Sequence, residues 1–270
     1  MNTLLELSNV ALKFAGLTAL NEVSLAIPEK SVFAVIGPNG AGKTSLFNCI
    51  SGVYRPQQGA LRLAGESLLG LPPHAIAARG VARMFQNLAL FDNLTTLQNL
   101  LLGAHHGFAT RAWQDLLWTK RARNEEVRQR AAVEEVIEFL ELERYREYPV
   151  GLLPYGVRKR IELGRALCMK PRLLLLDEPA AGLNREETEE LATFILDIRN
   201  ELGVTQLLIE HEMSLVMDLA DRVAVLDFGQ KIAEGTPDEV RRDPKVAEAY
   251  LGKQAPLDTP ADAGYSGLKA

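Results

Sequence analysis

Two kinds of strand are predicted by the pattern of hydrophobic and polar positions in the first third of the chain. Val23, Leu25 and Ile27 alternate with polar or small residues, which indicates a strand with one buried face. Residues 32–36 form a continuous apolar run, which is typical of a strand buried on both faces. Residues 59–69 are expected to form a hairpin with Gly65 in its turn. We therefore expect antiparallel strands combined with one buried strand.

Helical spacing replaces this pattern between about residues 95 and 168. Val133, Val136, Ile137 and Leu140 recur at the spacing of one helix face. Residues 111–130 lean basic and residues 131–147 lean acidic. We interpret both stretches as solvated helix faces, with a surface for binding a partner as the alternative.

Strands and helices alternate again in the last third. In order, we expect a buried strand, an amphipathic helix, two further strands and a turn (residues 173–176, 184–202, 204–209, 223–226 and 228–235). Thr236 to Glu239 form a capping box with proline at the first helical position, so a helix should begin there. Residues 253–270 are rich in Pro, Gly, Ala and Asp and are expected to form a mobile tail. The predicted fold class is an α/β core interrupted by a helical insertion.

Composition limits the classes of function. The chain has 30 Lys and Arg against 35 Asp and Glu, and this acidic balance argues against tight electrostatic binding of nucleic acid. Its two cysteines, Cys49 and Cys168, lie in unrelated segments and are interpreted as small buried residues of a reducing compartment. The first residues do not resemble a signal peptide, and no apolar run approaches the ~20 residues needed to span a bilayer. A role at a membrane would therefore be that of a peripheral subunit.

A phosphate-binding loop is the clearest chemical motif. Residues 37–44 fit the pattern GxxxxGK[ST], between a predicted buried strand and a predicted helix. Glycines allow several backbone N–H groups to point at one anion, and the helix N-terminus adds its positive end. Lys43 would place its charge on the β- and γ-phosphates, and Thr44 would offer a hydroxyl to Mg²⁺. The candidate nucleotide-binding residues of this segment are Gly37, Pro38, Asn39, Gly40, Ala41, Gly42, Lys43, Thr44 and Ser45.

Two carboxylates follow the apolar run at residues 173–176. Asp177 and Glu178 are placed at the C-terminal edge of a strand, where open α/β sheets bind their ligands. One carboxylate there suits Mg²⁺, which prefers oxygen ligands, and the next residue can orient a water molecule. We assign Asp177 to the metal and Glu178 to the water.

These motifs, in this order, resemble the ATP-binding subunits of ABC transporters over residues 3 to about 252. The resemblance implies a P-loop NTPase core with an antiparallel β subdomain and a helical subdomain at about residues 95–168. It also implies that Phe14 stacks on adenine, although Phe14 could instead be a core strand residue. Gln86 would sense Mg²⁺ and the γ-phosphate, Tyr155 and Gly156 would belong to the signature segment, and His211 would be the switch histidine. Glu178, His211 and Gln86 would then be catalytic, and Thr44, Gln86 and Asp177 would serve the metal.

Four short segments resemble the branched-chain amino-acid importers within that family: residues 177–184, 209–213, 232–237 and 249–252. This resemblance implies ATP and Mg²⁺ as cofactors, and a peripheral position at the cytoplasmic face of the inner or plasma membrane. A second ATPase subunit, identical or related, would bind head-to-tail. Two polytopic permease subunits would cross the membrane, and a periplasmic or extracellular solute-binding protein would act indirectly. Nucleic acid is not an expected partner.

Pro154 departs from the family pattern, which has serine at this position of the signature segment. Proline has neither the hydroxyl nor the N–H that serine offers to the γ-phosphate of the partner's ATP. A hydrogen bond to a charged group contributes ~1.5–3 kcal/mol, so we expect a weaker or slower closed dimer. Gly156 and the charges of Arg158 and Lys159 are expected to offset part of the loss.

Two other functions stay open at this point. One is a soluble ABC ATPase acting on nucleic acid or ribosomes, and the other is a weakly hydrolysing regulatory nucleotide switch, which Pro154 favours. Phe91, Asp92 and Leu94 lie where the family docks its membrane partner, with a local core contact as the alternative for Phe91. The remaining motifs are interpreted as a surface loop, at His105 and His106, and as core packing, at Trp113 and Trp118.

Overall fold

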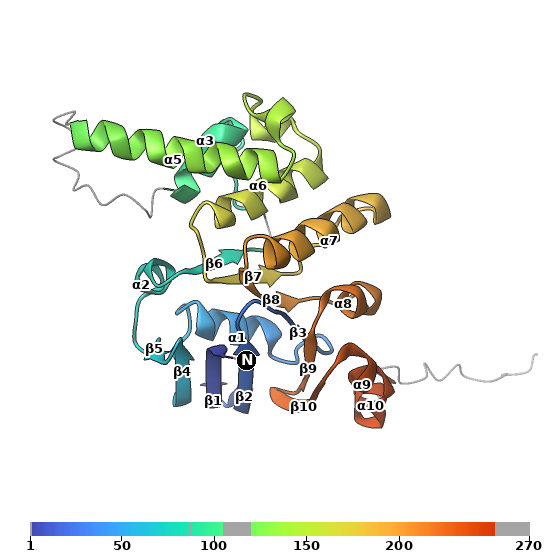
Figure 1. Cartoon of the computed structure of the whole chain (residues 1–270). Helices are drawn as coiled ribbons and strands as arrows, with labels where there is room; N and C mark the ends of the chain where they lie inside the picture. Colours follow the sequence, from blue (N-terminus) through green and yellow to red (C-terminus); the bar gives the residue numbers. More distant parts are fainter. Residues whose placement is uncertain (1, 87, 105–119, 252–270) are drawn as a thin grey trace, which may run out of the picture.

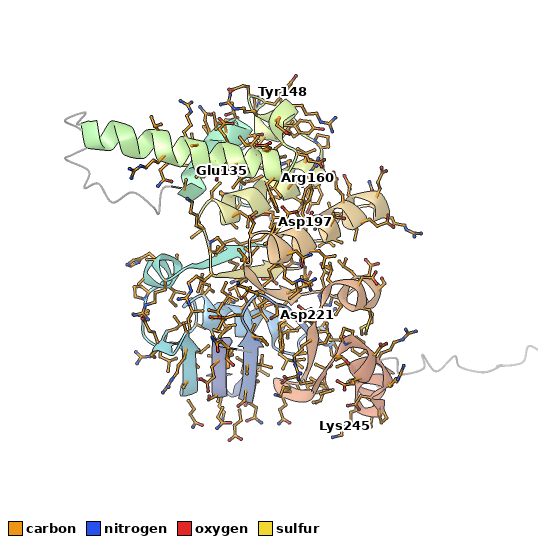
Figure 2. All side chains as sticks on the ribbon, in the orientation of Figure 1. Glu135, Tyr148, Arg160, Asp197, Asp221 and Lys245 are labelled. Carbon is orange, nitrogen blue, oxygen red and sulfur yellow. The ribbon has the colours of Figure 1, made fainter. Side chains whose placement is uncertain are left out.

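A computed structural model of the chain describes residues 2–86, 88–104 and 120–251. The motifs at residues 105–118 and the tail at 253–270 lie outside the described residues. Two sheets and a group of helices form three regions, with the antiparallel sheet at one end of the molecule and helices α3, α5 and α6 at the other (Figure 1). In Figure 2, Tyr148 marks the helical end and Lys245 lies near the opposite end.

The first sheet is antiparallel, with the strand order β2-β1-β4-β5. Its strands are β1 (Thr3–Phe14), β2 (Leu17–Pro28), β4 (Gln58–Leu63) and β5 (Glu66–Ser67). The alternation at Val23, Leu25 and Ile27 lies within β2, and all three side chains are buried. The predicted hairpin is confirmed, because β4 pairs with β5 across a turn in which Gly65 has a positive φ of 81°.

The second sheet has the strand order β10-β9-β3-β8-β7-β6. Its strands are β3 (Val32–Ile36), β6 (Val81–Met84), β7 (Leu173–Asp177), β8 (Thr205–Ile209), β9 (Arg222–Asp227) and β10 (Gln230–Gly235). All neighbours pair in parallel except β9 and β10, which are antiparallel. The carboxyl ends of β3, β8, β7 and β6 therefore meet at one edge of the sheet.

Helices cover the second sheet and extend beyond it. They are α1 (Lys43–Ile50), α2 (Pro73–Ala78), α3 (Thr96–Ala104), α5 (Lys120–Phe139), α6 (Tyr155–Leu167), α7 (Arg185–Asn200), α8 (Met213–Leu219), α9 (Pro237–Arg242) and α10 (Pro244–Leu251). Two short 3₁₀ helices, Glu143–Tyr145 and Val150–Leu152, connect α5 to α6. The capping box predicted at Thr236 is confirmed at the start of α9.

The central strands separate two hydrophobic cores, which explains their continuous apolar sequence. In β7, Leu173 and Leu175 pack into the core shared with α1 and the antiparallel sheet. Leu174 and Leu176 face the other way, into the core shared with α6 and α7. Because both faces are covered, no position on this strand tolerates a polar side chain until the strand ends at Asp177.

One predicted element is wrong. Residues 228–235 were expected to form a turn, but only Phe228 and Gly229 do so, and β10 follows as an edge strand. An edge strand needs only partial burial, and Gln230 and Lys231 of β10 are exposed. The strand therefore lacks the apolar sequence by which a strand is recognised. Within the described part of the chain, no helix is both long and apolar enough to cross a membrane.

Candidate nucleotide-binding and hydrolytic site

The loop between β3 and α1 requires glycine at two positions. A Cβ at Gly37 would lie 2.0 Å from the carbonyl oxygen of Leu226, and one at Gly42 would lie 2.5 Å from that of Ala19. Both residues have positive φ angles, 149° and 102°, which favour glycine further. Gly42 caps α1 directly, so the helix N-terminus opens onto the loop.

Lys43 lies across this loop. Its side chain is almost fully buried, and Nζ donates to the carbonyl oxygens of Gly37 at 2.6 Å and Pro38 at 3.1 Å. Loop carbonyls thus hold the ammonium group at the start of α1, where a bound anion would meet it together with the helix N-terminus. A Cβ at Gly40 would meet no atom within 4 Å, so this side of the loop faces open space.

Glu178 occupies a strained position at the end of β7. Its φ is 49°, in the left-handed region, and its backbone N–H donates to the carbonyl of Ile209 on β8 at 2.9 Å. The carboxylate of Asp177, in contrast, is buried and pairs with Arg83. Two adjacent carboxylates are thereby placed in different environments.

Three predicted catalytic residues meet at the Glu178 carboxylate. Gln86 Nε2 donates to Oε2 at 2.8 Å, and His211 Nε2 contacts Oε1. Gln86 follows β6, Glu178 follows β7 and His211 follows β8, so three neighbouring strand ends deliver one residue each.

Glu210 supports this cluster and was missed by sequence reasoning. Its two carboxylate oxygens accept from the backbone N–H groups of Ala180, at 3.0 Å, and His211, at 3.1 Å. Burial raises the pKa of Glu210. The carboxylate thus joins the turn after Glu178 to the turn that carries His211. Its signal in the sequence is a charged residue directly after an apolar strand.

A cleft of about 380 Å³ brings most of the predicted residues together. It is lined by residues 39–45, Glu178 and His211, and on its other side by Phe14, residues 17–19 and Phe228. Phe14 is partly exposed, and its ring packs edge-on against Tyr54 with centroids 5.0 Å apart. A flat apolar group could therefore lie beside Phe14 while an attached anion reaches the loop.

Tyr155 and Gly156 do not line this cleft. Tyr155 Oη donates to the carbonyl of Ala181 at 3.3 Å, and a Cβ at Gly156 would lie 2.4 Å from a carboxylate oxygen of Glu187. Pro154 precedes them as the N-cap of α6 and makes no side-chain hydrogen bond there. Within one chain, this segment lies beside the turn at Ala181 and the start of α7 at Glu187.

Arg158 and Lys159, whose charges are expected to offset part of the loss at Pro154, both have partners within the chain. Arg158 pairs with Asp92 at 2.6 Å. Lys159 is fully buried, and its Nζ donates to the carbonyl oxygen of Gln86 at 3.1 Å. Burial lowers the pKa of Lys159. Lys159 therefore ties α6 to Gln86, a link without a signal in the sequence.

The residues present fit a magnesium-bound triphosphate. The hydroxyl of Thr44, the amide oxygen of Gln86 and the carboxylate of Asp177 are the hard oxygen donors that Mg²⁺ prefers. The loop supplies a buried ammonium, a helix N-terminus and an open face at Gly40. These features together suit several phosphate groups rather than a single carboxylate.

Comparisons with known families agree with this geometry. Residues 20–181 match the family model "ABC transporter", and residues 230–256 match "Branched-chain amino acid ATP-binding cassette transporter". The chain is 45% identical to the high-affinity branched-chain amino acid transport ATP-binding protein BraF of Pseudomonas aeruginosa over 93% of this chain and 98% of that protein. It is 42% identical to LivG of Escherichia coli, a protein with the same description, over the same shares of the two chains.

A solved structure shares the fold. The ADP conformation of MJ1267, an ATP-binding cassette of an ABC transporter, superposes with a TM-score of 0.82 and is 30% identical. The match covers 93% of this chain and 100% of that one. The expected P-loop core with an antiparallel sheet and a helical insertion is thus confirmed.

Proposed function

Because the chain belongs to the ABC transporter family of ATP-binding proteins, we propose that it hydrolyses ATP to power uptake of branched-chain amino acids or related small solutes. The geometry that carries this proposal is the meeting of Gln86, Glu178 and His211 beside the Lys43 loop. The two relatives named above are branched-chain amino acid transport ATP-binding proteins, so action on nucleic acid is not favoured.

Hydrolysis would proceed by positioning and charge stabilisation, as is usual for phosphoryl transfer. Lys43 would bind the β- and γ-phosphates, and Phe14 would stack on the adenine. Glu178 would orient and polarise the attacking water, while His211 would contact the γ-phosphate and hold the attack geometry. Thr44, Gln86 and Asp177 would hold Mg²⁺, which when bound neutralises charge that develops on the phosphate oxygens.

A second ATPase subunit would complete each site. In a head-to-tail pair, Tyr155 and Gly156 of one subunit would face the nucleotide held by the loop of the other. Their position outside the cleft of their own chain supports this role. We assign residues 1–252 to one nucleotide-binding domain, with its helical subdomain at about residues 95–168 and the tail beyond.

Membrane subunits would dock near residues 91–94 and 148–152. Backbone hydrogen bonds join these segments, from Val150 to Leu94 and from Gly151 to Asp92. Their large side chains Phe91, Tyr148 and Leu152 are 58%, 56% and 78% exposed, which is unusual for apolar groups gathered in one region. This exposed apolar surface is consistent with docking to two polytopic membrane subunits. The chain would then lie at the cytoplasmic face of the membrane, and a solute-binding protein would act on the other side.

Calorimetry and uptake together test the proposal. The purified chain should bind Mg·ATP and hydrolyse it, and Lys43→Ala should abolish both. Cells lacking the gene should lose uptake of labelled leucine, and the wild-type gene but not the Lys43→Ala gene should restore it. Absence of a heat of binding for the wild-type chain, or full rescue by Lys43→Ala, would contradict the proposal.

A further inference from the structure

Arg83 forms a buried ion pair with Asp177. Arg83 lies on β6, and its Nη2 is 2.6 Å from Asp177 Oδ2 at the end of the neighbouring strand β7. The two side chains are only 9% and 6% exposed. A buried pair is costly to break, because removing one partner leaves the other charge without compensation.

The same guanidinium also binds the helix that follows the phosphate-binding loop. Its Nη1 donates to Asn48 Oδ1 at 2.8 Å and to Ser51 Oγ at 3.3 Å, at the C-terminal half and end of α1. The N-terminal end of this helix carries Lys43 and Thr44. Arg83 therefore joins the strand that ends in one candidate metal ligand to the helix that begins with another.

Two aromatic rings hold the guanidinium between these partners. Its central carbon lies 4.9 Å from the centroid of Phe85 and 5.7 Å from that of Phe47. Phe85 directly precedes Gln86, and Phe47 lies on α1. Lysine could not reproduce this arrangement, because it lacks the planar fork that binds several acceptors at once.

On the proposed function, this arrangement has a specific consequence for metal binding. A carboxylate that binds a metal is oriented by hydrogen bonds from a surrounding second layer of residues. We propose that Arg83 is the positioning residue of the magnesium site, which fixes one oxygen of Asp177 and leaves the other for the metal. Arg83 itself touches neither the nucleotide nor the metal.

Manganese binding provides the test. Mn²⁺ is titrated into the chain loaded with a non-hydrolysable ATP analogue, and free Mn²⁺ is followed by electron paramagnetic resonance. Arg83→Gln should raise the half-saturating Mn²⁺ concentration about 10- to 100-fold, the usual effect of removing such a partner. Arg83→Lys should cause a smaller increase. Binding of the analogue in EDTA should stay within about twofold of wild type, a result that general damage to the loop would not give.

Arg79→Gln is the matched control. Arg79 lies four positions earlier, is partly exposed and pairs with Glu66, so its loss should leave Mn²⁺ binding unchanged. A folded Arg83→Gln variant with wild-type Mn²⁺ affinity, or with equal loss of analogue binding in EDTA, would overturn the proposal. If Arg83→Gln fails to fold, the Asn48→Ala and Arg83→Lys variants provide the test instead. Unchanged Mn²⁺ affinity in both of these variants would overturn the proposal.

Failure of this inference differs from failure of the proposed function. A wild-type chain that does not bind the analogue at all would refute the function. A wild-type chain that binds both analogue and Mn²⁺, beside variants that do so equally well, would refute only the role of Arg83.

Discussion

The side chains of Glu178 and His211 contact one another, although 33 positions separate them in the chain. The contact exists because β7 and β8 are parallel neighbours, with Asp177 opposite Ile209. Both residues therefore leave the sheet at the same edge and at the same height. A group held between them is oriented by two strands rather than by a flexible loop.

Glu178→Gln should lower ATP turnover about 10²- to 10⁴-fold, the usual contribution of a positioned base. The amide keeps the size of the side chain but cannot polarise the water as the carboxylate does. ATP affinity should stay near wild type, and dimers should persist in ATP. Steady-state phosphate release and size-exclusion chromatography measure these effects. Glu212→Gln, one position beyond His211, is the control, and multiple turnovers at the wild-type rate in Glu178→Gln would remove Glu178 from the role.

Phe14→Ala should weaken binding of Mg·ATP by ~1–3 kcal/mol, the range for stacking of a base on an aromatic ring. Calorimetry measures the change, and Phe14→Tyr should keep most of the affinity because it keeps the ring. If Phe14 serves only the contact with Tyr54, Phe14→Ala should lower the melting temperature and leave ATP affinity unchanged.

Pro154→Ser should strengthen ATP-driven dimerisation about 10- to 100-fold, which corresponds to one hydrogen bond to a charged group. Analytical ultracentrifugation of a hydrolysis-deficient background measures the dimer constant. Serine also caps helices, so the variant should gain about 0.5–2 kcal/mol of stability as a monomer. Pro154→Ala separates the contribution of the N–H from that of the hydroxyl, since it restores the N–H but supplies no hydroxyl. Equal dimer constants in all three chains would show that Pro154 has no functional cost.

Both thiols should be inert in the folded chain. Burial raises the pKa of Cys49 and of Cys168 to about 12, so almost no thiolate exists at pH 8. Iodoacetamide should label neither residue in buffer and both in concentrated guanidinium, as mass spectrometry would show. Because the folded pKa lies above the unfolded value of about 8.5, these thiols favour folding less as pH rises from about 8.5 to 12, by up to ~1.4 kcal/mol per pH unit for each thiol. Rapid labelling of the native chain at pH 8 would contradict the burial.

The central strands and the phosphate-binding loop could be predicted because their sequences are locally distinctive. A strand buried on both faces, such as β7, must be apolar throughout, and the loop must have glycine where a Cβ would collide. The edge strands β6 and β10 could not be predicted in this way. Each is short and carries charged residues, such as Arg83 and Lys231, that a solvated turn would also accept.

The supporting residues of the site left almost no trace in the sequence. Arg83, Lys159 and Glu210 act through partners on other strands and helices, so their importance depends on strand order rather than on neighbouring residues. Lys43, Asp177 and Glu178 differ from these supporting residues, because each lies in a short sequence pattern that indicates its chemical role. Position in the sheet was therefore needed to find the residues that orient the site.

Gly37 and Gly40 both lie in the phosphate-binding loop, but their surroundings are opposite. The space beside Gly37 is filled by the backbone of Leu226, and the space beside Gly40 is empty. In a saturation mutagenesis library, position 37 should reject every replacement because the chain cannot fold around it. Position 40 should instead yield soluble asparagine and aspartate variants, since these residues adopt positive φ most readily. Glycine at position 37 is thus required by the packing of the protein itself, whereas glycine at position 40 is required only by the molecule that binds beside the loop.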